Sequence, residues 1–278
     1  MGWSISVRIG VLGLGHVGLP IARSLHVRKH EVFSWSRTLV SHPWTHSTSL
    51  ETMRQRKLDC LIVASGSVRP RFGDHISEVN STIDLIPESL RQENTKILYV
   101  SSGAVYGECS TPKSENDTIV PTTTYGKAKA YAENEFSKVF KDRFSSLRVS
   151  NVIDWNMPYG ILAMAKKAKE IGVLDLFGES EDCRDYIDID DLCLMIATIL
   201  ELNSTENVIN LGSGVPISLG DFRETFCNFF PNVEVRWNPA REFDVARTLL
   251  DVSKIKNLST ICPLDPHLLL EKYFTQRV

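Results

Sequence analysis

A short apolar run followed by three closely spaced glycines constrains the fold of this 278-residue chain more than any other feature. Residues 7–12 have the length and composition of a buried strand, and a GxGxxG turn follows before a helical pattern that continues to about Arg28. In such a turn the first glycine allows the bend, the second lets the backbone approach a pyrophosphate, and the third lets helix and strand pack closely. This order predicts a parallel β-α-β unit that binds a dinucleotide. We expect its contacts from Gly13, Gly15, Val17 and Gly18, and from His16 unless that side chain is merely a surface residue.

Apolar runs with the length of buried parallel strands recur along the chain, at residues 5–12, 58–64, 97–100, 147–151 and 208–211. Helix-like segments fill the gaps between them, and a chain that is 42% hydrophobic can bury a sizeable core. We therefore predict an α/β fold, a Rossmann-type doubly wound parallel sheet with a smaller C-terminal substrate lobe. Residues 1–150, with 185–212 returning to them, should form the NAD(P)-binding domain, and 151–184 and 213–278 the substrate-binding lobe.

The end of the next strand, at residues 31–35, bears on the choice of cofactor. An acidic residue there would bind the adenosine 2′-hydroxyl and repel a 2′-phosphate. Ser36 and Arg37 stand at this place instead, and a guanidinium beside a hydroxyl suits a phosphate. The sequence thus favours NADP, with NAD as the alternative if Arg37 is only a solvated surface residue. The expected cofactor contacts are completed at the ends of two further strands, by Ala64 and Ser65 at the end of the strand at 58–64 and by Ser101 after the strand at 97–100.

Three residues between positions 102 and 129 have the types and spacing needed for hydride transfer to or from a carbinol carbon. Lys129 follows Tyr125 by one helical turn, so its ammonium is expected to lower the pKa of the phenol. Ser102 follows an apolar strand and should place its hydroxyl at the open edge of the sheet, where it can bind the same substrate oxygen. A YxxxK pair alone also occurs by chance, and the glycine-rich turn is what makes a catalytic role the better interpretation.

Five segments in a fixed order carry a family resemblance. They are Ser101-Ser102-Gly-Ala-Val-Tyr106-Gly, Tyr125-Gly-Lys-Ala-Lys129 with Glu133 after it, Arg148-Val-Ser-Asn151, Arg184-Asp185-Tyr-Ile-Asp-Ile-Asp190-Asp191, and Asn210-Leu-Gly-Ser-Gly214. Together they resemble the extended short-chain dehydrogenase/reductases of the nucleotide-sugar epimerase, dehydratase and reductase group.

The resemblance implies a role for each matching position. Tyr125 would be the acid/base, Lys129 its electrostatic partner and a ligand of the nicotinamide ribose, and Ser102 the residue that orients the reacting oxygen. The sugar nucleotide would be held by Asn151 and by Arg184 or Arg241, with the arginines on its diphosphate. Asn80 would pack beneath the cofactor, or is simply a satisfied polar residue. The helix that begins near Tyr125 would pair with its copy in a homodimer.

Departures from the family pattern bear on the reaction. About twenty residues separate Arg37 from the strand at 58–64, so only a remnant of the family's next strand is expected, around Trp44. Gly103 and Ala104 replace the Asp-Glu pair that dehydratases of this group use as a separate acid and base, which argues against dehydration. We expect an NADPH-dependent reductase of a keto-sugar nucleotide, with an NAD-dependent 4-epimerase as the alternative and a non-catalytic NADP sensor as a third possibility.

Charge and cysteine content exclude several other classes of function. The net charge of −3 gives no basic field for nucleic acid or acidic membranes. The six cysteines include no CxxC pair, and neither they nor the seven histidines show metal-ligand spacing, so no metal site is expected. No apolar segment is long enough to cross a bilayer, and no signal sequence is recognisable. We therefore expect a cytoplasmic protein with no membrane partner.

Overall fold

Seven parallel strands form the central sheet of the part of the chain that the structure describes. The computed structural model describes residues 6–36, 46–47, 57–66, 74–86, 88, 94–241 and 244–276. The strand order is β10-β6-β5-β4-β1-β2-β3, so it reverses between β1 and β4, and ligands of such sheets bind outside the carboxyl ends of the strands at this point. The strands are β1 (Arg8–Leu12), β2 (Glu31–Trp35), β3 (His46–Ser47), β4 (Cys60–Val63), β5 (Lys96–Ser102), β6 (Phe144–Val149) and β10 (Val208–Leu211).

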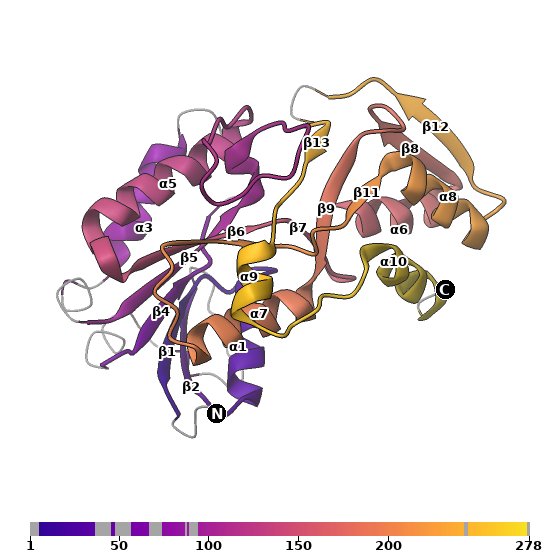
Figure 1. Cartoon of the computed structure of the whole chain (residues 1–278). Coiled ribbons are helices and arrows are strands. Elements are labelled where there is room, and N and C mark those ends of the chain that lie inside the picture. The colour runs from indigo at the N-terminus through magenta and orange to yellow at the C-terminus, as the bar shows by residue number, and fades with distance from the viewer. Residues whose placement is uncertain are drawn as a thin grey trace.

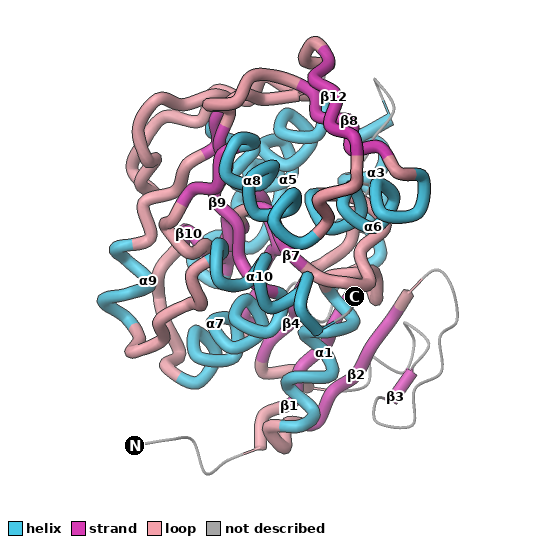
Figure 2. The backbone as a smooth tube through the Cα atoms, turned by 90° about the vertical axis from the view of Figure 1, so that its right-hand side faces the viewer, coloured by secondary structure: helices cyan, strands magenta, loops and turns pink. Residues whose placement is uncertain are grey.

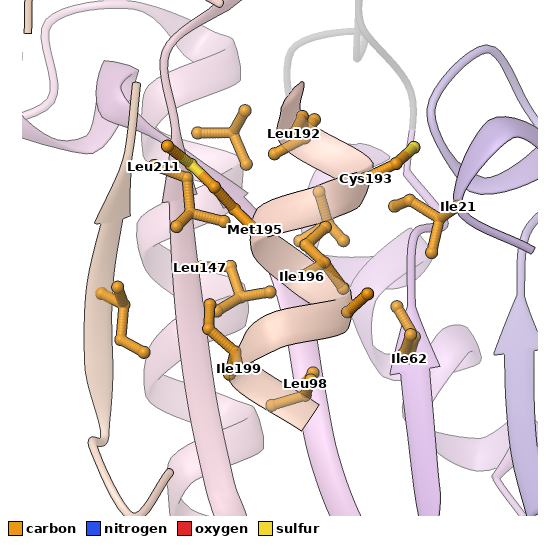
Figure 3. Packing of buried hydrophobic residues seen from close by; sticks show 14 of the residues in the cluster. Ile21, Ile62, Leu98, Leu147, Leu192, Cys193, Met195, Ile196, Ile199 and Leu211 are labelled. Atoms are coloured by element: carbon orange, nitrogen blue, oxygen red, sulfur yellow. The ribbon is translucent and has the colours of Figure 1, made fainter. Parts of the chain in front are cut away.

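Helices cover both faces of this sheet (Figure 1). One face packs on α1 (Gly18–Val27), α7 (Ile189–Glu201) and α9 (Ser253–Leu258), and the other on α3 (Asp74–Leu85) and α5 (Thr124–Phe140). Figure 3 shows α7 directing Leu192, Met195 and Ile196 into the core above the strands. Because apolar residues occupy most positions of α7, the helix is buried along nearly its whole length.

The C-terminal lobe has its own core and is joined to the sheet by a second, smaller one. In Figure 2, α8 and β12 lie toward the top, away from β1, β2 and α1. The lobe packs the aromatic residues Phe222, Phe226 and Phe274 together. Its elements are α6 (Ile161–Ile171), the parallel pair β8 (Val173–Phe177) and β12 (Glu234–Asn238), α8 (Leu219–Phe229) and α10 (Pro266–Gln276). The second sheet contains β7 (Asn151–Ile153), β9 (Cys183–Asp188), β11 (Pro216–Ser218) and β13 (Arg247–Thr248).

The predicted fold class is confirmed, although element boundaries differ from the expected ones. The strand expected at 147–151 begins earlier, at Phe144, and ends at Val149, while Asn151 starts β7 and pairs with β9 of the second sheet. Of residues 185–212, α7 and β10 pack on or extend the central sheet, whereas residues 185–188 complete β9. The short strand β3, which pairs with β2, lies close to the expected remnant near Trp44. Trp44 itself lies outside the described residues.

Candidate functional site

The glycine-rich turn lies at the carboxyl end of β1 and leads into α1. The Gly13 amide donates to the Trp35 carbonyl at 2.8 Å, and Gly13 has a φ of 99°, a value that L side chains rarely adopt. A Cβ at Gly18 would lie 1.9 Å from the Gly13 carbonyl oxygen, whereas a Cβ at Gly15 would meet nothing within 4 Å. The turn is thus closely packed at its first and third glycines and open at the second. A phosphate can approach the backbone there and face the N-terminus of α1.

The end of β4 borders the same turn. A Cβ on Gly13 would lie 2.8 Å from the Ser65 amide nitrogen, and the Ala64 amide donates to the Leu12 carbonyl at 2.8 Å. Among the described residues, the buried Ser65 hydroxyl has no hydrogen-bond partner. A buried polar group in that position suits a ligand that supplies the missing partner, as the phosphates or ribose of a dinucleotide would.

The adenosine end of the expected cofactor site is only partly described. Ser36 follows β2 directly and is half-buried. Arg37, on which the preference for NADP mainly depends, lies outside the described residues.

Ser102 and Tyr125 are brought together by the packing of α5 on the turn that follows β5. Ser102 ends β5 and caps the 3-10 helix η1 (Gly103–Tyr106), where its hydroxyl accepts from the Ala104 amide at 3.2 Å. The Thr123 hydroxyl caps α5 by accepting from the Gly126 amide at 3.0 Å. A Cβ at Gly126 would lie 2.4 Å from the Ala104 carbonyl oxygen, so only glycine lets the helix approach this closely. This packing brings the Ser102 hydroxyl close enough to the Tyr125 phenol to act on its pKa.

Lys129 lies beneath the two phenol rings of Tyr99 and Tyr125. Its Nζ is 4.8 Å from the Tyr99 ring centroid and 5.9 Å from that of Tyr125, and it donates to the Val100 carbonyl at 2.8 Å. The ammonium is therefore held at the carboxyl end of β5, one helical turn from the phenol that it is expected to assist. The three predicted catalytic residues meet at one place.

Burial dominates the electrostatics of this group. It raises the pKa of Tyr125 to about 12, against the opposing hydrogen bond from Ser102. It also lowers the pKa of Lys129 to about 8, against the attraction of Glu78 and Glu133. The upward shift of the Tyr125 pKa is opposite to the expected one, because desolvation of the phenolate is a larger effect here than the neighbouring ammonium.

A pocket opens between α3 and α5 beside these residues. It is lined by Ser65, Gly66, Glu78, Val79, Thr82, Tyr99, Tyr125, Ala128, Lys129, Ala132 and Phe136. Glu78 was not anticipated from the sequence, where one acidic residue in a polar helix has no distinguishing signal. Asn80 is exposed on the same helix, and its Oδ1 accepts from the Tyr131 hydroxyl at 3.3 Å. The structure thus places Asn80 in contact with α5.

A buried polar network fixes β5, β6 and α5 relative to one another. Arg148 and Glu133 form an ion pair with a shortest distance of 2.8 Å and side chains less than a tenth exposed. Glu133 also accepts from the hydroxyls of Ser101 at 2.6 Å and Ser146 at 2.8 Å. Ser101, expected as a cofactor contact, thus directs its hydroxyl into this network. Arg148 further donates to the Tyr106 hydroxyl at 2.9 Å.

The expected substrate residues lie on the second sheet and in the C-terminal lobe. Asn151 donates to the Asp185 carbonyl at 3.1 Å, and Arg184 donates to the Val245 carbonyl at 2.7 Å. Arg241 pairs with Asp244 through two hydrogen bonds of 2.8 and 2.9 Å and lies 4.5 Å from the Phe177 ring.

Asp244 pairs with Arg241 and also feels the charge of Arg184. Burial alone would raise the pKa of this carboxyl group, but the hydrogen bonds from Arg241 and the charges of both arginines hold it below its ordinary value. Among the described residues, the ion pair of Asp244 is with Arg241.

Tyr159 is a site residue that sequence reasoning missed. Its ring contacts that of His16 in the glycine-rich turn, with centroids 5.9 Å apart, and its phenol is close enough to influence the pKa of Tyr125. No signal in the sequence marks it, because it lies outside every motif that carries the family resemblance.

Within the described residues, no group of three or more His, Cys, Asp or Glu side chains could hold a metal ion. None of the described helices is long and apolar enough to span a bilayer.

Curated proteins similar to this chain include sugar-nucleotide enzymes of more than one reaction type. The dTDP-4-dehydro-6-deoxyglucose reductase of Escherichia coli is 35% identical over 140 residues, which cover 47% of this chain and 44% of that protein. The putative UDP-arabinose 4-epimerase 4 of Arabidopsis thaliana is 29% identical over 207 residues, which cover 63% of this chain and 47% of that protein. The chain thus spans less than half the length of both relatives.

Solved structures match along almost the whole chain, and a family model matches most of it. The UDP-glucose 4-epimerase of Thermus thermophilus, in complex with NAD, has a TM-score of 0.81 at 19% identity and covers 98% of this chain and 100% of that chain. The UDP-glucuronic acid 4-epimerase of Bacillus cereus, in complex with UDP-glucuronic acid and NAD, has a TM-score of 0.78 at 20% identity, with the same coverage. At these identities the likeness shows the fold alone. Residues 9–212 match the family model, and the chain belongs to the NAD dependent epimerase/dehydratase family.

Proposed function

We propose that the protein reduces the ketone of a keto-sugar nucleotide with NADPH. The observation that carries this proposal is the contact of Ser102, Tyr125 and Lys129 at the carboxyl end of β5. Bound NADPH supplies the hydride. Tyr125 donates the proton to the ketone oxygen, Ser102 orients that oxygen, and the Lys129 ammonium stabilises the phenolate that remains.

The protonation state of Tyr125 supports reduction over oxidation. With a pKa of about 12, the phenol carries its proton at neutral pH. A ketone reductase needs a proton donor at the start of its reaction, whereas an enzyme that first oxidises an alcohol needs a base. The Escherichia coli relative, with 35% identity, is named as a reductase of a 4-dehydro sugar nucleotide.

Residues other than Ser102, Tyr125 and Lys129 are proposed to bind the cofactor and the substrate. Gly15 and the unpartnered Ser65 hydroxyl suit the dinucleotide, and no carboxylate stands at Ser36 to repel a 2′-phosphate. Arg184 and Arg241 are proposed to bind the diphosphate of the sugar nucleotide. Their guanidinium groups are planar donors that match phosphate oxygens, and that of Arg241 already binds a carboxylate, Asp244.

An NAD-dependent 4-epimerase is the second candidate. The Arabidopsis thaliana relative is named as a putative 4-epimerase and covers more of this chain than the reductase does. The solved 4-epimerases of similar fold contain NAD. An epimerase would use the same three residues in both directions on one carbon.

The test is a turnover assay with two kinds of substrate. We expect the purified protein to oxidise NADPH in the presence of dTDP-4-dehydro-6-deoxyglucose, and NADH more slowly. Interconversion of UDP-sugar 4-epimers without net loss of nicotinamide, together with slowly exchanging NAD released on denaturation, would instead establish the epimerase.

Substitution of Tyr125 tests the assignment of the proton donor. We expect Tyr125→Phe to lower kcat by about 10²- to 10⁴-fold, the usual contribution of a general acid, with NADPH affinity unchanged. Tyr131→Phe, which removes the hydroxyl of another half-buried tyrosine on the same helix, is the matched control. A fully active Tyr125→Phe variant would contradict the assignment.

A further inference from the structure

The loop between β7 and α6, residues 154–160, places a second phenol beside the reaction centre. The Tyr159 and His16 rings meet edge to face, with planes at 89° and centroids 5.9 Å apart. Tyr159 is also near enough to Tyr125 for a charge on its phenol to raise the pKa of Tyr125. Its side chain therefore lies against the turn expected to hold the pyrophosphate and in the neighbourhood of the expected proton donor. The loop leads into α6 of the C-terminal lobe, whereas His16 lies on the glycine-rich turn after β1 and Tyr125 lies on α5, both beside the central sheet.

This loop is anchored by contacts of its own. The Trp155 ring stacks on Tyr273 of α10, with centroids 6.2 Å apart and planes at 11°. The Lys166 ammonium lies 5.1 Å from the centroid of the Trp155 ring and donates to the Trp155 carbonyl. Met157 is 3% exposed. Gly160, with a φ of 82°, then lets the chain turn into α6 directly after Tyr159. The position of Tyr159 is thus set by the packing of the C-terminal lobe.

The chemistry of Tyr159 is that of a hydrogen-bonding group. Its ring is half-buried, and burial raises the pKa of its phenol, so the hydroxyl keeps its proton at neutral pH. Tyr125 already fills the role of proton donor in the proposed reaction. A neutral phenol next to it can bind the oxygens of a sugar ring, which are both donors and acceptors.

We propose that Tyr159 is a substrate-contacting residue that hydrogen-bonds the hexose of the sugar nucleotide beside its reacting carbon. This rests on the proposed function, because it assumes a sugar-nucleotide substrate. The loop that carries Tyr159 follows β7 directly and leads into α6 of the C-terminal lobe. A contact with the hexose from this loop would help to set which sugar the protein accepts.

Titration calorimetry distinguishes the contribution of the hexose to binding from that of the nucleotide. Protein saturated with NADP is titrated with dTDP and with dTDP-glucose, and again with UDP and UDP-glucose, for the wild type, Tyr159→Phe and Tyr273→Phe. The Tyr273→Phe variant is the matched control, because it keeps the ring on Trp155 and loses only the hydroxyl that donates to Asp188 at 3.0 Å. Thermal unfolding and NADPH affinity are measured for each variant.

We expect Tyr159→Phe to weaken binding of the preferred sugar nucleotide by about fivefold, the usual cost of one neutral hydrogen bond. Its affinity for the bare nucleotide and for NADPH should equal that of the wild type, and Tyr273→Phe should bind all ligands normally. Equal affinity of Tyr159→Phe and wild type for the sugar nucleotide would overturn the proposal, as would weaker binding of NADPH or of the bare nucleotide.

The titrations and the turnover assay together distinguish this proposal from the proposed reaction. A wild type that binds the sugar nucleotides but reduces no keto sugar would overturn the reductase, while the Tyr159 comparison would still decide the contact. A wild type that binds neither sugar nucleotide would overturn both.

Discussion

At the scale of single residues, Tyr125 and Lys129 have opposite pKa shifts with one cause. Burial opposes charge on either group, so it raises the pKa of the phenol to about 12 and lowers that of the ammonium to about 8. Lys129 is protonated below its pKa and neutral above it, and the proposed reaction needs the ammonium. Glu78 attracts this ammonium and thus opposes the lowering of its pKa.

Activity should therefore fall as the pH rises through about 8, the pKa of Lys129. In Glu78→Gln the attraction is lost, so the pKa of Lys129 should drop further and the fall in kcat/KM should begin at lower pH. Glu135→Gln, which breaks an exposed pair with Lys138 on α5, is the control. The pH profile of kcat/KM measures the effect. An unchanged profile in Glu78→Gln would refute the role of this carboxylate.

At the scale of elements, the ion pair of Glu133 and Arg148 joins α5 to β6, and the hydroxyl of Ser101 ties β5 to the same carboxylate. The network holds the helix that bears Tyr125 against the strand that bears Ser102. Ser101, Glu133 and Arg148 come from three separate segments of the chain, so only the packing of the fold creates this network.

We expect Glu133→Ala to lower the free energy of unfolding by about 3 to 5 kcal/mol, since it leaves the Arg148 charge buried without a carboxylate to balance it. Chemical denaturation of the variant and the wild type gives this difference. The control Glu234→Gln, which affects a fully exposed pair with Arg236, should leave stability nearly unchanged. Equal stability of Glu133→Ala and wild type would show that the buried pair contributes nothing.

At the scale of the whole molecule, α3 and α5 lie side by side on one face of the central sheet (Figure 1). Ile76 on α3 and Val139 on α5 are 45% and 38% exposed. The family resemblance implies a homodimer through the helix of Tyr125, and we propose that these two helices form its interface.

The chain should sediment as a dimer at micromolar concentration, and Ile76→Glu should shift it toward monomer, because a charge in an apolar interface is costly to bury. Leu268→Glu, at another exposed apolar residue, on α10, is the control and should remain dimeric. A wild type that sediments only as monomer would refute the interface.

The sequence by itself determined the features that depend on local pattern. Apolar runs, the three glycines after β1 and the four-residue spacing of Tyr125 and Lys129 are set by neighbours along the chain, so the fold class and the meeting of the expected catalytic residues could be predicted. Boundaries failed where pairing with a distant strand decides, as at Asn151, which leaves the strand expected at 147–151 and pairs with β9.

Tertiary structure alone decided the environment of these residues. Segments far apart in sequence bury Tyr125 and so raise its pKa. They also bring Ser101 to Glu133, and Tyr159 to His16. Burial and long-range contact are properties of the packed chain, and no short pattern encodes them. Chain segments carry the chemical groups, whereas their packing sets the pKa values and the neighbours through which those groups act.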